Sequence, residues 1–169
     1  MAQKSSYVTV DGEFDSLEDR SFLTMDDYEL SGENVILRID INSSINPENG
    51  DLLDDTRIKR HSATVKELSD KNARVIVLAH QSRPGKLDFV NLEKHGKRMS
   101  EIIEREIKFV DDIYGEKAIQ EIKNIKDGQI ILLDNVRFDK EEINLKTFEN
   151  DNFKTQSNAR MVKTLAPHA

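Results

Sequence analysis

A change of character in the stretch VIVLAHQSRPGK marks the first residues that could do chemistry. A run of Val, Ile, Leu and Ala, typical of a buried strand, passes directly into His80, Arg83 and Lys86. Arginine suits phosphate and carboxylate groups because its planar guanidinium donates two parallel hydrogen bonds. The stretch therefore predicts an anion-binding loop at the end of a strand.

Polar side chains follow two other apolar runs in the same way. Asp40 and Asn42 come at the end of NVILRIDIN, and Asn135 and Arg137 come directly after GQIILLD. Arg57 lies at the head of the helix that is predicted after the first run. Ligands of open parallel sheets bind outside the carboxyl ends of the strands, so these groups are predicted to converge at one edge. The three arginines with His80 suit a small molecule that carries both phosphate and carboxylate groups. Asp40 and Asn42 suit the hydroxyl groups of a ligand, or they hold the arginines in position.

Each of these residues also has a plainer interpretation. A single arginine after a strand is most often a solvated surface charge, and Asp40 could simply cap a turn. His80 taken alone is more often a structural hydrogen-bonding residue than a catalytic base. The hypothesis of a site depends on the shared position of these residues and not on any one of them.

The strands that would hold these residues are four apolar runs separated by helical patterns. The first, second and fourth runs are continuous, which is typical of strands that are covered on both faces. The alternation predicts an α/β fold, a parallel sheet with helices on both faces in a Rossmann-like three-layer α/β/α arrangement. The runs span residues 34–41, 73–79, 107–113 and 128–134, and the helices are expected within 55–72, 91–106, 115–126 and 153–165.

Three features depart from this alternation. Residues 1–30 are polar without a sustained period, and we interpret them as an N-terminal arm ahead of a domain at 31–169. Asn49 and Gly50 form a typical type I′ turn pair and predict a small β-hairpin between the first strand and the first helix. Gly96 lies inside the second predicted helix, where glycine costs about 1 kcal/mol relative to alanine.

The composition excludes several classes of function. The 169 residues carry 25 Lys and Arg against 32 Asp and Glu, a net charge of −7, which argues against a nucleic-acid binder. No cysteine is present, so disulfides and thiolate metal sites are excluded, and we expect a cytoplasmic location. No apolar run approaches the ~20 residues needed to span a bilayer, so no membrane partner is expected.

The common motifs for nucleotides and metals are also missing. The chain contains neither G-x-x-x-x-G-K-[ST] nor G-x-G-x-x-G, the two frequent loops that cradle nucleotide phosphates. The four histidines do not have the spacing of zinc ligands, so no metal site is predicted. A nucleotide site is therefore not expected on this chain.

Several segments, in order along the chain, resemble phosphoglycerate kinases, and most of all their archaeal branch. VILRIDIN resembles the first strand of the family with its R-x-D-x-N segment, and LAHQSRPG resembles its H-x-G-R-P-x-G-type loop. DDTRIKRH resembles the segment with a single arginine ahead of the first helix, and ILLDNVRF resembles the L-E-N-x-R-F strand end. KTLAPHA resembles the stretch that leads into the next strand, so the resemblance runs from about Val35 to Ala169.

The resemblance implies a two-domain enzyme of glycolysis that moves a phosphoryl group between ADP or ATP and the carboxylate of 3-phosphoglycerate. Its N-terminal domain holds 3-phosphoglycerate or 1,3-bisphosphoglycerate, and its C-terminal domain holds the magnesium nucleotide. Arg57 would be the catalytic arginine, which stabilises charge on the phosphoryl group in flight. The implied substrate contacts are Asp40, Ile41, Asn42, Arg57, His80, Gln81, Ser82, Arg83 and Arg137.

The chain departs from the family pattern in one loop and in length. Ser82 stands where the family usually has glycine, and a side chain there would crowd a backbone that approaches the ligand. The resemblance covers well under half of a full member and lacks the nucleotide-binding domain, so no bound Mg-ATP or Mg-ADP is expected here. We therefore expect a truncated N-terminal domain, inactive alone, with marginal stability or self-association through an uncovered sheet edge. The alternative is a stand-alone, non-enzymatic anion-binding or interaction domain derived from the kinase, which Ser82 favours.

Overall fold

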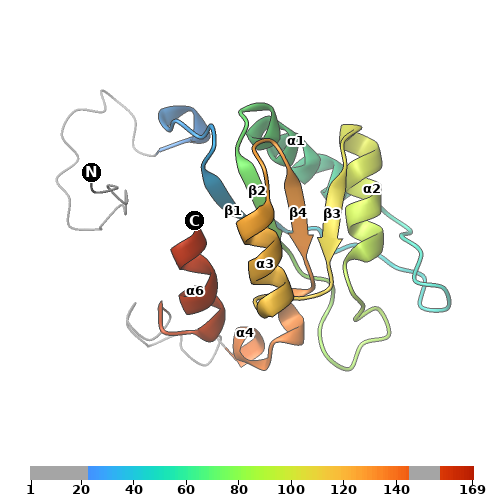
Figure 1. The fold of residues 1–169 in the computed structure, drawn as a ribbon. Helices are drawn as coiled ribbons and strands as arrows, with labels where there is room; N and C mark the ends of the chain where they lie inside the picture. Colours follow the sequence, from blue (N-terminus) through green and yellow to red (C-terminus); the bar gives the residue numbers. More distant parts are fainter. Residues whose placement is uncertain (1–22, 145–156) are drawn as a thin grey trace.

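The computed structural model describes residues 23–144 and 157–169 of the chain. At its centre lies a four-stranded parallel sheet in the order β1-β2-β4-β3. The strands are β1 (Asn34–Arg38), β2 (Arg74–Leu78), β3 (Ile107–Val110) and β4 (Ile130–Leu133). Figure 1 shows β2 and β4 in the middle of the sheet, with β1 and β3 at its two edges.

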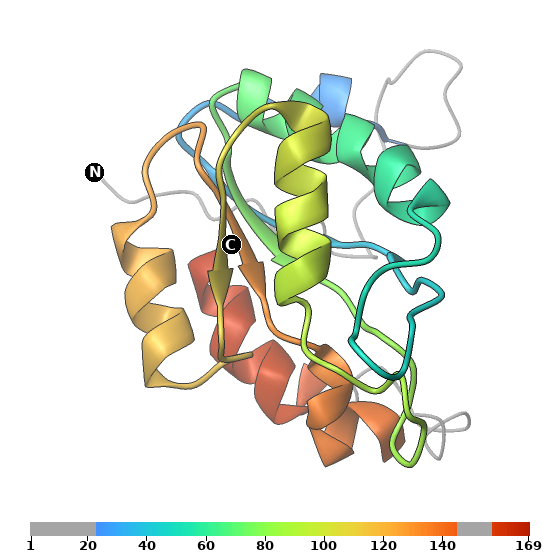
Figure 2. The same ribbon diagram turned by 90° about the vertical axis from the view of Figure 1, so that its right-hand side faces the viewer.

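Helices cover both faces of this sheet. The helices α1 (Thr56–Asp70) and α2 (Glu93–Ile103) lie on one face, and α3 (Glu116–Asn124) and α6 (Arg160–Leu165) lie on the other (Figures 1 and 2). Four shorter segments complete the described helical structure: η1 (Met25–Asp27), η2 (Val136–Phe138), α4 (Lys140–Asn144) and η4 (Ala166–His168). The predicted α/β fold with a parallel sheet between two helical layers is confirmed.

The side chains of the central strands alternate between two hydrophobic clusters. Val75 and Val77 of β2 belong to the cluster that contains residues of α1 and α2. Ile76 and Leu78 belong to the cluster that contains residues of α3 and α6. Successive positions of β2 are therefore apolar because both faces of the sheet are buried.

The first apolar run behaves differently from the prediction that it is covered on both faces. Every residue of β1 is half-buried or exposed, whereas four of the five residues of β2 are buried. The order of the sheet explains the difference, since β1 is an edge strand that pairs only with β2 among the described residues. Its apolar residues contact the helical layers on both faces of the sheet, but these layers cover the edge strand only in part.

The other predicted elements are present, most of them shorter than their apolar patterns. The third strand ends at Val110, and the hairpin predicted at Asn49 and Gly50 is reduced to one antiparallel bridge between Ile45 and Leu52. Gly50 has the positive φ of 71° that its turn requires. The helix predicted at 153–165 lies partly outside the described residues, and α6 forms its second half.

Most of the arm predicted at residues 1–30 lies outside the described residues. Within its described part, Met25 and Leu30 pack against the hydrophobic core. Thr24 and Asp27 form a capping box at η1. The hydroxyl of Thr24 accepts from the N–H of Asp26, and the carboxylate of Asp27 accepts from the N–H of Thr24. These last residues of the segment therefore belong to the packed domain.

Gly96 lets α2 lie close to the sheet. A Cβ atom on Gly96 would lie 3.1 Å from Cδ2 of Leu132, a fully buried residue of β4. The conformational cost of a glycine inside a helix is thus offset by close packing of helix on strand. This packing also brings the neighbouring residue His95 into contact with Gln81, in the loop after β2.

Candidate functional site

The loops that follow β1 and β2 meet the first turn of α1 at the carboxyl ends of the strands. Arg57 donates a hydrogen bond from Nη1 to Oδ2 of Asp40 at 2.5 Å. His80 places Nε2 4.0 Å from Oδ1 of the same carboxylate. The main-chain N–H of Asn42 also donates to Asp40, at 3.1 Å. Three of the residues singled out in the sequence therefore lie around the carboxylate of a fourth, Asp40.

Ser82 connects this group to the loop after β4. Its main-chain N–H donates to Oδ1 of Asn42 at 2.7 Å, and its carbonyl oxygen accepts from Nη1 of Arg137 at 2.6 Å. Its hydroxyl donates to Oδ1 of Asp88 at 2.6 Å. The loops after β1, β2 and β4 are thus held together by hydrogen bonds to a single residue.

The backbone of Ser82 explains why the H-x-G-R-P-x-G-type loop has glycine at this position. Its φ is 55°, in the left-handed region that residues with a Cβ atom rarely adopt. Glycine adopts this region without steric cost. Serine is held there by its partners on three sides, so the loop keeps the conformation that glycine would allow.

A buried polar network lies beneath these loops. Gln81 is fully buried, and its amide bonds both main-chain groups of Ser43, from N–H to Oε1 at 2.9 Å and from Nε2 to the carbonyl at 3.0 Å. Asn135, also fully buried, donates from Nδ2 to the carbonyls of Gln81 at 2.8 Å and Val90 at 2.9 Å. Asn135 therefore holds the loops in place and does not point out of the edge.

Two of the predicted substrate contacts do not present their side chains at this edge. Ile41 and Gln81 are both 0% exposed. Ile41 belongs to the hydrophobic core, and Gln81 is occupied by the network described above. Because this exposure counts main chain and side chain together, neither residue can touch a ligand in this conformation, a distinction that sequence spacing cannot make.

Two cations at the edge differ in whether they have a partner. Arg83 follows Ser82 and is exposed, and its side chain has no hydrogen bond or ion pair with the described part of the chain. Arg38, at the end of β1, is paired with Glu142, whose side chain is nearly buried. Arg38 is not among the site residues predicted from the sequence. The available signal was its place two residues before Asp40, where strand alternation puts both side chains on one face.

The electrostatics of the edge keep His80 neutral and Asp40 charged. Burial lowers the pKa of His80, and the charges of Arg137 and Arg38 lower it further, against the opposing effect of Asp40. Burial works against the charge on Asp40, but its hydrogen bonds from Asn42 and Arg57 hold the pKa of Asp40 below its ordinary value. A neutral imidazole, a carboxylate and several guanidinium groups can together bind the hydroxyl and anionic groups of one ligand.

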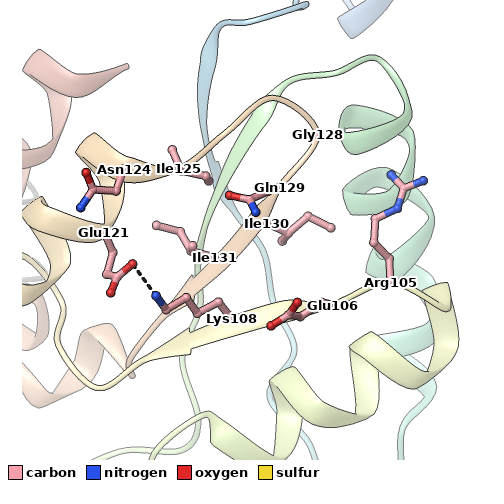
Figure 3. A pocket seen from close by; sticks show the side chains of 10 residues that line it. All are labelled: Arg105, Glu106, Lys108, Glu121, Asn124, Ile125, Gly128, Gln129, Ile130 and Ile131. Atoms are coloured by element: carbon pink, nitrogen blue, oxygen red, sulfur yellow. Dashed lines mark hydrogen bonds and ion pairs between the residues drawn. The ribbon is translucent and has the colours of Figure 1, made fainter.

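A hollow of about 560 Å³ lies away from these loops, at the amino ends of β3 and β4 (Figure 3). Both cations that line it are paired: Lys108 with Glu121 at 2.7 Å and Arg105 with Asp70 at 2.7 Å. Figure 3 shows the Lys108–Glu121 pair across the hollow. Because both cations already have acidic partners, this hollow is a weaker candidate for anion binding than the loop that contains Ser82.

Neither a metal centre nor a membrane span is found in residues 23–144 and 157–169. No group of three or more His, Cys, Asp or Glu side chains in that part is arranged to hold a metal ion. No helix within it is long and apolar enough to cross a bilayer. The carboxylates closest to the site, Asp40 and Asp88, bond Arg57 and Ser82 instead.

Comparison with known proteins identifies the family. The family model for phosphoglycerate kinase matches residues 25–169, which includes all the residues that meet at this edge. The chain belongs to the phosphoglycerate kinase family. The resemblance predicted from the separate segments is therefore confirmed.

Named relatives agree with this assignment. The phosphoglycerate kinase of Methanothermobacter thermautotrophicus is 48% identical over 86% of this chain and 34% of its own length. That of Methanothermus fervidus is 52% identical over 72% of this chain and 30% of its own length. The solved phosphoglycerate kinase from Pyrococcus horikoshii OT3 has a TM-score of 0.78 and 28% identity, over 86% of this chain and 34% of that one. The chain therefore spans about a third of the length of the curated relatives it matches.

Proposed function

We propose that this chain is the phosphoglycerate-binding part of a phosphoglycerate kinase. Such an enzyme transfers a phosphoryl group between ATP or ADP and 3-phosphoglycerate or 1,3-bisphosphoglycerate. The observation that carries the proposal is the meeting of Arg57, His80 and Arg137 at one edge of the sheet, linked through Asp40 and Ser82. Membership of the family supports the same reading.

Each proposed role suits the chemistry of its residue. Arg83 and Arg137 bind the anionic groups of the ligand, because guanidinium groups donate paired hydrogen bonds to phosphate or carboxylate. Asp40 and the neutral His80 suit the ligand hydroxyl. Arg57 is the proposed catalytic arginine, which exchanges its ion pair with Asp40 for the phosphoryl group in flight. The remaining proposed substrate contacts are Asn42 and Ser82, whereas the fully buried Ile41 and Gln81 are not proposed as contacts in this conformation.

The magnesium nucleotide has no proposed place on the described residues. They contain no metal-binding cluster, and the chain has neither of the two common phosphate loops. We therefore propose no nucleotide contact for these residues. We propose that the chain alone shows no turnover in an assay with 3-phosphoglycerate and Mg-ATP. We also propose a cytoplasmic location.

A titration with 3-phosphoglycerate, followed by the NMR amide shifts of Asn42 and Ser82, tests the proposal. We expect saturable shifts, and an affinity about tenfold or more weaker in Arg83→Ala and in Arg137→Ala. Arg74→Ala is the matched control, because Arg74 pairs with Asp127 at the opposite end of β2. Absence of shifts at millimolar ligand would contradict the proposal.

The same titration distinguishes the substrate-binding part of a kinase from a stand-alone anion-binding domain. Ser82 favours the stand-alone domain, because its side chain occupies a glycine position of the family loop. A retained substrate site binds 3-phosphoglycerate more tightly than 2-phosphoglycerate or inorganic phosphate, since its hydrogen-bonding groups are placed for one isomer. Equal affinity for all three ligands would support the non-enzymatic alternative.

We also propose the outer edge of β1 as a surface for a second copy of this chain. The carbonyl of Glu33 accepts from Arg74, and the N–H of Ile39 donates to Leu78, so these residues face β2. Strand alternation then turns the N–H and carbonyl groups of Ile36 outward. Unpaired groups on a strand edge favour pairing with another strand.

A further inference from the structure

We propose that Gln81 is a positioning residue for the substrate loops and that His95 fixes the orientation of its side chain. The inference rests on the proposed function, because these loops carry the proposed substrate contacts. Gln81 itself is fully buried, so its side chain acts through its neighbours and not by touching the ligand. Three observations support this role.

The first observation is that the Gln81 amide takes over where strand pairing ends. The register between β1 and β2 ends at Arg38 and Leu78, and a last main-chain hydrogen bond joins Ile39 to Leu78 at 3.0 Å. Farther along both loops, the side chain of Gln81 bonds the N–H and the carbonyl of Ser43. A side-chain amide thus pairs with a main-chain amide as a neighbouring strand would.

The second observation is that this pair lies next to the contact between the two substrate loops. Asn42 precedes Ser43 and Ser82 follows Gln81, and Oδ1 of Asn42 accepts from the N–H of Ser82 at 2.7 Å. The Gln81–Ser43 pair and the Asn42–Ser82 bond are adjacent hydrogen-bonded contacts between the same two loops. The Gln81–Ser43 pair and the Asn42–Ser82 bond therefore hold the Asp40 side of the site at a defined distance from the Arg83 side.

The third observation is the burial of His95. Its Nε2 lies 3.1 Å from Oε1 of Gln81, and its Nδ1 is buried without a hydrogen-bond partner in the described residues. Since Oε1 is an acceptor, the neutral ring carries its proton on Nε2. Burial lowers the pKa of His95 to about 4, so the ring is neutral at pH 7.

The N–H and carbonyl of Ser43 orient the Gln81 amide, and Nε2–H of His95 adds a second donor that favours the same orientation. A flipped amide would place its NH2 group against two donors, the N–H of Ser43 and Nε2–H of His95. An unpaired buried nitrogen is unfavourable, so an apolar residue would serve stability alone better than His95 does. Orientation of Gln81 explains why a histidine stands there.

The variant Gln81→Leu tests the Gln81–Ser43 hydrogen bonds in the absence of ligand. The variant removes the acceptor for the Ser43 N–H, so we expect the amide hydrogen of Ser43 to exchange at least about tenfold faster, with altered amide shifts at Asn42 and Ser82. Gln120→Leu, the same change on the exposed face of α3, is the matched control. Unchanged exchange at Ser43 in a folded Gln81→Leu variant would overturn the proposal.

The variant His95→Leu tests the role of His95 in ligand binding. It should remain folded, so it keeps the proposal testable if Gln81→Leu does not fold. We expect its resistance to urea to be equal to or above that of the wild type, because an unpaired buried nitrogen is lost. Its affinity for 3-phosphoglycerate should nevertheless fall by about three- to tenfold. Unchanged affinity would overturn the role of His95, since a merely structural residue leaves binding by the folded protein intact.

The two experiments separate this inference from the proposed function. If the wild type does not bind 3-phosphoglycerate, the proposed function fails, and hydrogen exchange at Ser43 still decides whether Gln81 positions the loops. If the wild type binds and both variants bind equally well, the positioning role fails alone. A long-range nitrogen NMR spectrum that shows the His95 proton on Nδ1 would also contradict the inference.

Discussion

Ser82 combines an uncommon backbone conformation with hydrogen bonds to Asn42, Arg137 and Asp88. A left-handed conformation costs a residue with a Cβ atom about 1–2 kcal/mol, and it persists where the surrounding structure determines it from several sides. The strain therefore lies at the point where the three loops of the proposed site meet. At the scale of single residues, the hydrogen bonds of Ser82 hold its strained backbone in place and thereby fix the loops of the proposed site.

Substitution of Ser82 measures this strain. Ser82→Gly should change the free energy of unfolding by less than about 1 kcal/mol, because relief of the left-handed strain opposes loss of the Asp88 hydrogen bond and the flexibility of glycine. Ser82→Val should destabilise the protein by about 2 kcal/mol or more, since a β-branched residue fits this conformation poorly. Urea unfolding of both variants checks the difference, and equal stabilities would contradict it.

His95 links stability to pH. Its pKa is about 4 in the folded protein against about 6.5 when unfolded. Between these values the unfolded chain binds a proton that the folded chain does not, so stability falls as the pH is lowered from 7 to 4. The loss from His95 amounts to about 3 kcal/mol, and no more is lost to this residue below pH 4. His80, whose pKa burial also lowers, acts in the same direction.

The comparison of wild type with His95→Leu isolates this effect. Urea midpoints measured between pH 7 and pH 4.5 should fall less steeply in the variant, because one proton-binding group of the unfolded state is gone. His61→Leu is the control, because His61 is only half-buried. Parallel pH profiles for wild type and His95→Leu would show that His95 titrates normally in the folded protein.

At the scale of elements, the position of α2 determines the geometry of the site. The helix supplies His95 beneath Gln81, and its distance from the sheet is set at Gly96, where a Cβ would lie 3.1 Å from Leu132. The fully buried Leu132 has little room to move away. A glycine that weakens the helix in isolation thus strengthens its packing in the fold.

Gly96→Ala should accordingly destabilise the protein. The gain in helix propensity is about 1 kcal/mol, whereas overpacking of a filled core costs about 1–3 kcal/mol, so we expect a net loss of about 1 kcal/mol. In a Leu132→Val background, which makes room for the added methyl group, the same substitution should become neutral or stabilising. A stabilising effect in both backgrounds, measured by thermal unfolding, would contradict the packing argument.

At the scale of the whole molecule, the two edges of the sheet have different surroundings. β1 is half-exposed along its length, and its outward main-chain groups form no strand pair among the described residues. β3, at the other edge, is short and carries the charged residue Lys108, paired with Glu121. A charge inside an edge strand resists pairing, whereas the charged residue of β1, Arg38, lies at the end of its strand, so β1 is the edge expected to associate.

Sedimentation velocity over a concentration series tests association through β1. We expect the chain to form dimers at increasing concentration, and Ile36→Pro to shift the equilibrium toward monomer, since proline removes an outward N–H without taking one from the β1–β2 ladder. A circular dichroism spectrum of the variant must match that of the wild type. A monomer at all concentrations would contradict the proposed second-copy interface.

The sequence by itself determined the class of fold and the neighbourhood of the proposed site. Runs such as Val75–Ala79 are apolar at successive positions because their strands are buried on both faces, and helical patterns between them imply parallel strands. Parallel strands end at one edge, so the polar residues after them had to come near one another. Their order along the chain was sufficient for this prediction.

Only the tertiary structure decided which of these side chains face outward and which strand lies at an edge. Arg38 pairs with Glu142 across 104 residues of sequence, and Gln81 turns inward to Ser43 while Arg83 stays free of partners in the described residues. The order β1-β2-β4-β3 likewise leaves β1 half-exposed despite its apolar pattern. Periodicity records local contact with one face or two, whereas pairing and burial depend on groups that the fold brings together from distant parts of the chain.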